Sequence, residues 1–137
     1  MRVILDTNVF VSGLASRPSR SGRLLEQWQE GRFYLLCCEE QIAEIRRVSR
    51  YAKLTSKLNP PRVGSMVNDI RATAVMISKL PQVDLSPDPF DNYRLAMAQV
   101  GRADYLVTVD KADLLSLGSH GATRIVSVRQ FADLLGL

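Results

Sequence analysis

Residues 3–12 read VILDTNVFVS, and this stretch decides how the chain is classified. Val3-Ile4-Leu5 is short, uniformly apolar and β-branched at two positions, which is typical of a strand buried on both faces. Because Asp and Asn are poor strand formers, we expect the strand to end near Asp6. A carboxylate at the carboxyl end of a buried strand lies where open α/β sheets usually bind ligands. The alternative is that Asp6 only caps the next helix.

Strand and helix patterns alternate along the rest of the chain. After a Ser- and Gly-rich loop or broken helix start at residues 12–21, we predict strands at residues 33–38, 83–85, 105–109 and 124–128, and helices at residues 22–31, 39–52, 61–80, 91–101 and 129–136. This alternation predicts an α/β fold in which a central, mostly parallel sheet lies between two helical layers. With neither a repeat nor a linker, residues 1–137 are expected to form a single domain.

The composition is that of a soluble globular protein, with 46% hydrophobic residues among 137. No apolar run approaches the roughly 20 residues of a membrane span, and Asp6 interrupts any signal-peptide pattern, so we expect a cytoplasmic protein with no membrane partner. Cys37 and Cys38 are adjacent and have no third cysteine to pair with, which favours buried thiols in a reducing compartment. His120 is the only histidine and lies in a predicted loop, so no histidine-dependent mechanism is expected.

The formal charge of +4 is unevenly distributed. Residues 17–62 contain ten Lys and Arg against five Glu, whereas the remainder contains eight against nine Asp and Glu. This asymmetry suits a protein that attracts a polyanion. A solvated helix face is the other interpretation of the same pattern.

A second predicted strand, residues 105–109, also runs into an aspartate, Asp110. If the two strands are parallel neighbours, Asp6 and Asp110 meet at one edge of the sheet. Asp91 lies in the first turn of the intervening helix, where it either caps that helix or joins the other two acids. Three acids on one edge repel each other unless a cation lies between them. Oxygen ligands of this kind favour Mg²⁺ or Mn²⁺.

Glu44 is the fourth candidate ligand. On a helical wheel it borders the apolar arc of the 39–52 helix, beside Val48, while Arg46, Arg47 and Arg50 lie on the opposite side. The alternative is an exposed Glu44 paired with Arg47. Other site motifs are missing from the sequence, since it contains no GxGxxG, no GxxxxGK[ST], no CxxC and no recognisable Ser–His catalytic pair.

With these acids in place, the chain resembles PIN-domain proteins, in particular the VapC-type ribonucleases that are toxins of toxin–antitoxin systems. The resemblance rests on ILDTNVFVSGL at residues 4–14, CCEEQIAEIRRV at 37–48, DPFDNYRLAMAQVGRADYLVTVD at 88–110, and the ending DLLSL…RIVSVRQF. It extends over nearly all 137 residues. It therefore implies a three-layer α/β/α PIN-like domain.

The resemblance also implies an activity and a set of site residues. It implies a Mg²⁺- or Mn²⁺-dependent endoribonuclease that cuts single-stranded RNA and acts as the toxin of a type II toxin–antitoxin pair, with a small antitoxin protein as partner. The residues that match the family's acidic positions are Asp6, Glu44, Asp91 and Asp110, with Asp88 and Asp113 at further acidic positions and Asn8 at a polar position near the first Asp.

The sequence departs from the family pattern at three positions. Cys38 stands where Ser is usual, Phe90 where another Asp is usual, and Val109 where Gly is usual before the last Asp. Two alternatives to the ribonuclease also stay open. One is a catalytically inactive PIN module that binds RNA or protein, and the other is a structure-specific DNA nuclease.

The predicted 61–80 helix bears on assembly. Apolar residues occur around much of its circumference, including Met66, Ala72, Val75 and Met76. A helix with more than one apolar stripe is buried on more than one side. We therefore expect a homodimer, as in similar PIN proteins, and the alternative is that a neighbouring helix of the same chain covers the extra face.

Overall fold

The computed structural model describes residues 1–51, 58–86, 88–109 and 112–137. In this part of the chain, six strands form one sheet in the order β3-β2-β1-β4-β6-β5. All neighbouring strands are parallel except β5 and β6, which confirms the mostly parallel sheet. The strand bounds are β1 (Arg2–Leu5), β2 (Tyr34–Cys38), β3 (Val75–Ile77), β4 (Tyr105–Thr108), β5 (Ser119–His120) and β6 (Thr123–Ser127).

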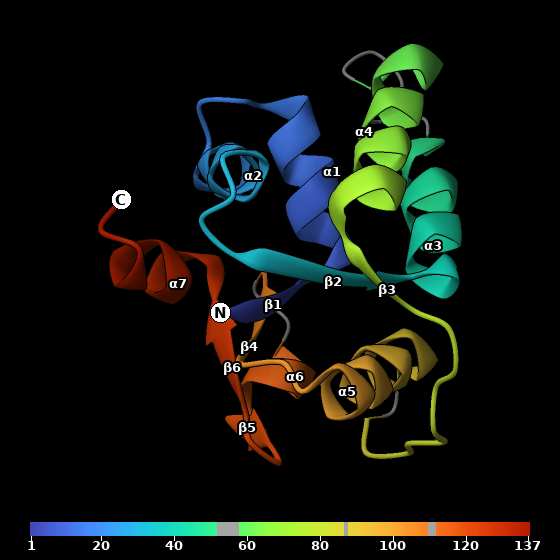
Figure 1. The fold of residues 1–137 in the computed structure, drawn as a ribbon, viewed down its shortest axis with the longest axis vertical. Helices are drawn as coiled ribbons and strands as arrows, with labels where there is room; N and C mark the ends of the chain where they lie inside the picture. The colour runs from blue at the N-terminus through green and yellow to red at the C-terminus, as the bar shows by residue number, and fades with distance from the viewer. Residues whose placement is uncertain (52–57, 87, 110–111) are drawn as a thin grey trace.

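Helices cover both faces of this sheet, as Figure 1 shows. Helices α1 to α4 and α7 pack on one face, and α5 and α6 pack on the other, so the three-layer α/β/α architecture is confirmed. None of the helices in the described residues is both long and apolar enough to cross a membrane. The helix bounds are α1 (Thr7–Ala15), α2 (Arg20–Gln29), α3 (Glu39–Ser49), α4 (Pro60–Thr73), α5 (Pro89–Gly101), α6 (Ala112–Leu115) and α7 (Val128–Leu134).

The sheet separates two hydrophobic cores. Val3 and Leu5 of β1 pack with Phe10 and Phe131 in the core beneath α1 and α7, whereas Ile4 packs in the core beneath α5. Successive side chains of a strand point to opposite faces, so a strand with helices on both sides must be apolar at every position. This is why the opening strand reads as an unbroken apolar run.

The predicted 61–80 helix is wrong in its second half. Helix α4 ends at Thr73, and residues 75–77 form the edge strand β3, which pairs with β2 through Leu36 and Val75. Apolar spacing of three or four fits a helix, but a β-branched segment beside an open sheet edge gains a ladder of backbone hydrogen bonds as a strand. Met66 is buried within its own chain at 3% exposure, so the surface that suggested a homodimer is partly covered by neighbouring elements.

Three smaller predictions also differ from the structure. Residues 83–85 form no strand, and β5 occupies part of the stretch predicted as a loop around His120. Helix α1 begins directly after Asp6 and continues to Ala15, into the segment predicted as a loop. Small residues there serve close helix packing, because a Cβ on Gly13 would lie 2.6 Å from Leu25 Cδ1 and 3.0 Å from the Ser21 carbonyl oxygen.

Candidate active site

The carboxyl ends of β1 and β4 lie side by side. Leu5 pairs with Val107, and the Asp6 amide donates to the Val107 carbonyl at 2.8 Å. The two strands that precede Asp6 and Asp110 are therefore parallel neighbours, which is the condition under which the sequence analysis expected the two acids to meet. Asp110 itself lies outside the described residues.

Asp6 occupies the N-cap position of α1, yet its side chain makes no capping hydrogen bond. The carboxylate is fully buried, and its Oδ2 accepts a hydrogen bond from Thr108 Oγ1 at 2.8 Å. Since Thr108 ends β4, this contact connects the two strand ends. The carboxylate is therefore directed toward the sheet edge and away from the helix it precedes.

Asp91 is also fully buried, in the first turn of α5. Its Oδ2 accepts from Ser86 Oγ at 3.2 Å. The next residue, Asn92, holds the loop that carries Ser86: its Oδ1 accepts from the Leu85 and Ser86 amides at 3.0 and 2.9 Å, and its Nδ2 donates to the Ser86 carbonyl at 2.9 Å. Two neighbouring residues of α5 therefore act together: Asp91 supplies the carboxylate, and Asn92 fixes the loop whose Ser86 hydroxyl orients it.

Glu44 lies on the buried side of α3, so the alternative of an exposed surface residue is wrong. Its Oε1 accepts from Thr7 Oγ1 and Tyr93 Oη, both at 2.6 Å. Arg47 Nη2 lies 3.9 Å from Oε2, so the Arg47 pairing that belonged to this alternative is present only at the distance limit of an ion pair. Gln41, one turn earlier, donates to the Leu5 carbonyl at 2.6 Å and thereby fixes α3 to the end of β1.

Arg94 lies between these acids, and the sequence analysis missed it. Its Nη2 is 2.8 Å from Asp6 Oδ1 and 2.6 Å from Glu44 Oε1, and its Nη1 is 3.1 Å from Asp91 Oδ1. The side chain is only 2% exposed. The available signal was an arginine three residues after Asp91 and directly before the apolar run LAMA, which places it on the inward face of α5.

Burial and neighbouring charges together shift the pKa values of Arg94 and Tyr93. Burial acts to lower the pKa of Arg94, but Asp6, Tyr93, Glu44 and Asp91 act in the opposite direction and the net pKa is raised. Burial raises the pKa of Tyr93, and Glu44 adds to the rise. Arg94 is therefore a permanent cation, and the Tyr93 hydroxyl stays protonated and donates to Glu44.

The structure describes the side chains of two of the remaining predicted site residues, Asn8 and Asp88. Asn8 lies in the first turn of α1 and is exposed. Asp88 is half-buried just before α5, where its carbonyl accepts from the Asp91 and Asn92 amides at 3.0 and 3.3 Å. The side chain of Asp113, in α6, lies outside the described part of the structure.

The described acids have the oxygen ligands that a divalent cation prefers, but the space between them is occupied by Arg94. Carboxylate oxygens are hard ligands of the kind that Mg²⁺ and Mn²⁺ prefer. Within the described ranges, however, no group of three or more His, Cys, Asp or Glu side chains is arranged as a metal site. The Arg94 guanidinium stands where the inner oxygens of Asp6, Glu44 and Asp91 converge.

The two cysteines do not contribute chemistry to this site. Burial raises the pKa of Cys37 to about 12 and that of Cys38 to about 11. Both thiols are therefore protonated at neutral pH, whereas the thiolate is the form that attacks or binds metal. The expectation that they are core residues is confirmed by their complete burial.

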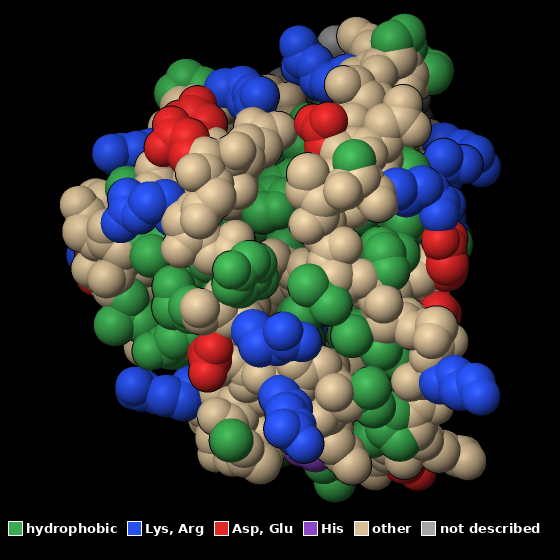
Figure 2. All heavy atoms as spheres, viewed as in Figure 1, with side chains coloured by type: hydrophobic (Ala, Val, Ile, Leu, Met, Phe, Trp, Pro, Cys, Tyr) green, Lys and Arg blue, Asp and Glu red, His purple; other side chains and the backbone are tan. Residues whose placement is uncertain are grey.

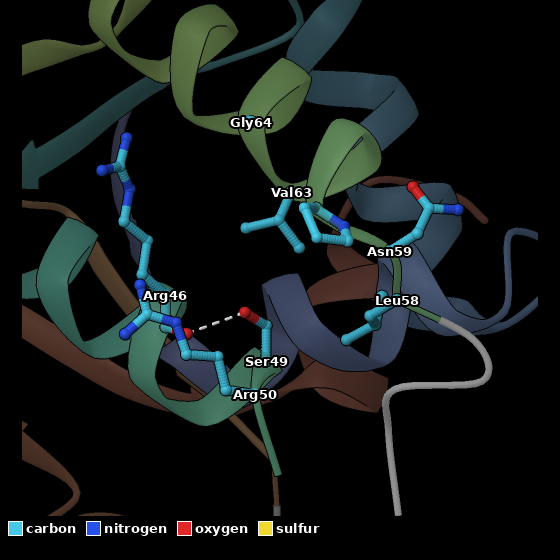
Figure 3. A pocket seen from close by; sticks show the side chains of 8 residues that line it. Arg46, Ser49, Arg50, Leu58, Asn59, Val63 and Gly64 are labelled. Carbon is cyan, nitrogen blue, oxygen red and sulfur yellow. Dashed lines mark hydrogen bonds between the residues drawn. The ribbon is translucent and has the colours of Figure 1, made fainter. Parts of the chain in front are cut away.

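Two cavities bring arginines close to the elements of the site. One, of about 340 Å³, lies at the carboxyl ends of β4 and β6 and is lined by Thr108, Arg20 and Arg129, among others. The other, of about 370 Å³, lies between α3 and α4. Figure 3 shows Arg46 and Arg50 on the α3 side of this second cavity.

Comparison with known proteins agrees with this geometry. The sequence matches the PIN domain family over residues 2–112, which is most of the chain. No curated protein and no solved structure matches it. PIN domains are generally nucleases and typically use divalent metals, which supports a nuclease-type function. The chain therefore belongs to the PIN-domain family.

Proposed function

We propose that this protein is a Mg²⁺- or Mn²⁺-dependent endoribonuclease that hydrolyses single-stranded RNA. The observation that carries the proposal is the convergence of three buried carboxylates, those of Asp6, Glu44 and Asp91, at the carboxyl edge of the sheet. Arg94 supplies one positive charge against three carboxylates, so a purely structural cluster would leave excess negative charge buried, which is unfavourable. Membership of a family of nucleases supports phosphodiester hydrolysis as the chemistry of this cluster.

In this proposal Asp6, Glu44 and Asp91 hold the metal together with Asp110, which follows β4 in the sequence. A bound divalent cation supplies an activated water and stabilises charge on the phosphate. The hydroxyls of Thr108, which donates to Asp6, and of Ser86, which donates to Asp91, orient the carboxylates. Hydrogen-bond partners of this kind normally fix the direction and basicity of metal-binding groups.

The basic residues supply the affinity for RNA. The cavity with Arg20 and Arg129 lies next to Asp6, because Thr108 lines the cavity and also donates to Asp6. Figure 2 shows further Lys and Arg side chains scattered over the face that it displays. Contacts between such side chains and phosphates give a sequence-independent affinity that falls as salt rises.

The same proposal includes the biological setting. We propose that the protein is the toxin of a type II pair, bound by a small antitoxin protein, and that it forms a homodimer. The support is the likeness of its motifs to VapC-type ribonucleases. Size measurement by light scattering at micromolar concentration checks the homodimer, for which one chain has a mass of 15.3 kDa.

The test is an RNA cleavage assay with Asp6→Asn. We expect cleavage of single-stranded RNA in Mn²⁺ to fall by at least about 100-fold, since changes to groups that only support a ligand already cost 10- to 100-fold. The matched control is Asp69→Asn, which removes an exposed carboxylate from α4 and should leave the rate unchanged.

Three outcomes separate the alternatives. Cleavage that survives both Asp6→Asn and EDTA contradicts the proposed metal chemistry. Binding of RNA without cleavage favours the inactive binding module. Cleavage of flap DNA in preference to single-stranded RNA favours the structure-specific DNA nuclease.

A further inference from the structure

Each of the three buried carboxylates directs its two oxygens to different partners. The inner oxygens, Asp6 Oδ1, Glu44 Oε1 and Asp91 Oδ1, lie within 3.1 Å of the Arg94 guanidinium. The outer oxygens contact other groups: Asp6 Oδ2 accepts from Thr108, and Asp91 Oδ2 accepts from Ser86. The inner oxygens are therefore the ones that surround a positive charge.

The position of Arg94 is fixed by the fold. It follows Asp91 by three residues on α5, so one helical turn brings its side chain over the same face. Its Nη2 bridges Asp6 and Glu44, which come from β1's end and from α3. Its Nε has no acceptor among the described residues, so the terminal nitrogens alone serve the acids.

The charge balance explains why a cation is needed there. The carboxylates contribute −3 and the guanidinium contributes +1. In a buried site, charges of one sign are stable only when they are paired and hydrogen-bonded. A divalent cation in the same place would meet the same inner oxygens, because they are the ones directed toward the centre of the cluster.

We propose that Arg94 is a resident counter-ion of the site, which holds the three carboxylates together in the metal-free chain and competes with the divalent cation for their inner oxygens. This inference rests on the proposed function, because it concerns the metal that the nuclease uses. Two ligands that compete for one set of groups weaken each other's binding, so Arg94 sets the metal affinity of the site. A purely structural Arg94, with the metal held by other oxygens, would leave that affinity unchanged.

The first test measures Mn²⁺ binding by isothermal titration calorimetry in wild type and Arg94→Met. We expect the variant to bind Mn²⁺ roughly tenfold more tightly or better, within the range typical of coupled binding equilibria. We also expect Mn²⁺ to raise its melting temperature by more than that of wild type, because binding to the folded state alone stabilises it. The matched control is Arg71→Met, which removes an exposed guanidinium from an ion pair with Glu39 and should bind Mn²⁺ like wild type.

The second test uses the unmodified chain and applies even if Arg94→Met fails to fold. The side-chain nitrogens of ¹⁵N-labelled arginine are followed by NMR during a Mg²⁺ titration, with the Arg94 signals assigned from Arg94→Lys. We expect the Arg94 signals to shift as Mg²⁺ binds and those of Arg71 to stay in place. Saturation with Mg²⁺ without any shift of the Arg94 signals would overturn the competition.

The outcomes distinguish this inference from the proposed function. Equal Mn²⁺ affinity in wild type and in a folded Arg94→Met would overturn the competition and leave a metal-dependent nuclease in place. If neither protein binds Mn²⁺ and RNA cleavage is insensitive to EDTA, both the proposed function and the competition are overturned.

Discussion

Two arginines of this protein pair with carboxylates in opposite surroundings. Arg94 is 2% exposed and contacts Asp6, Glu44 and Asp91, which come from three different elements. Arg71 contacts Glu39 through both terminal nitrogens, but the two side chains are 46% and 61% exposed. Both arginines pair with carboxylates, but water screens the exposed Arg71–Glu39 pair and does not screen the buried pairs of Arg94. The difference teaches that the energetic importance of an ion pair depends on burial and on the number of groups that rely on it.

The largest expected effect comes from the buried side of this comparison. In EDTA, Arg94→Met should lower the free energy of unfolding by about 3–5 kcal/mol, because it leaves buried carboxylates without their cation. Urea denaturation of wild type and variant measures the loss. A difference of less than about 1 kcal/mol, typical of an exposed pair, would break the comparison.

Tyr93→Phe tests a smaller part of the same cluster. The variant keeps the ring but removes the 2.6 Å hydrogen bond to Glu44 Oε1. We expect a loss of about 1.5–3 kcal/mol in the free energy of unfolding, the range for hydrogen bonds to charged groups. The control is Tyr34→Phe, since that tyrosine is 65% exposed and its variant should unfold like wild type.

The buried thiols of Cys37 and Cys38 extend the comparison of the two arginines to groups that are buried but uncharged at neutral pH. The pKa of Cys37 is about 12 in the folded chain against an ordinary value of 9.0, and that of Cys38 is about 11. Above pH 9.0 the unfolded chain loses thiol protons that the folded chain keeps. The thiols' contribution to stability is therefore complete below pH 9.0 and is lost as pH rises toward 11 and 12.

Unfolding free energy measured against pH checks this effect. Between pH 9 and 11 each thiol should contribute a decline of about 1.4 kcal/mol per pH unit. Cys37→Ala should show a shallower decline than wild type, whatever its stability at pH 7. Identical slopes for the two proteins would show that the thiol does not stay protonated in the fold.

The smallest effect belongs to the exposed pair. Arg71→Met should leave the urea midpoint unchanged within error, since solvent screens the contact with Glu39. The same variant in 1 M salt should match wild type in 1 M salt. A shift comparable to that of Arg94→Met would mean that burial does not distinguish the two arginines.

The acids of the site were predictable because their signals are local. Asp6 follows a strand whose last three residues are all apolar, and Asp91 lies in the first turn of a helix, so each position follows from a change in the sequence pattern. Glu44 was placed at the rim of an apolar helical face, and it is buried there. Of the other candidates, Asp110 and the side chain of Asp113 lie outside the described residues, and Asn8 is exposed.

The partners of these acids were not predictable in the same way. Thr108, Ser86 and Tyr93 are ordinary residues in their own segments, and they matter only because β4, the loop before α5 and α5 itself meet at one edge. The β3 segment is a similar case, since its apolar spacing fits a helix and the open edge of β2 makes it a strand. Contacts between segments far apart in the sequence decided both the hydrogen-bond partners of the acids and the strand conformation of β3.

The sequence by itself determined the α/β class, the parallel sheet and the strand end that carries Asp6, because side-chain periodicity and strand-breaking residues are properties of neighbouring positions. Only the tertiary structure decided what lies between the acids. Arginine in a helix is normally a surface residue. Arg94 is buried because carboxylates from the end of β1, from α3 and from α5 converge on it. Their combined negative charge stabilises a cation at this position, and no single segment of the sequence indicates that charge.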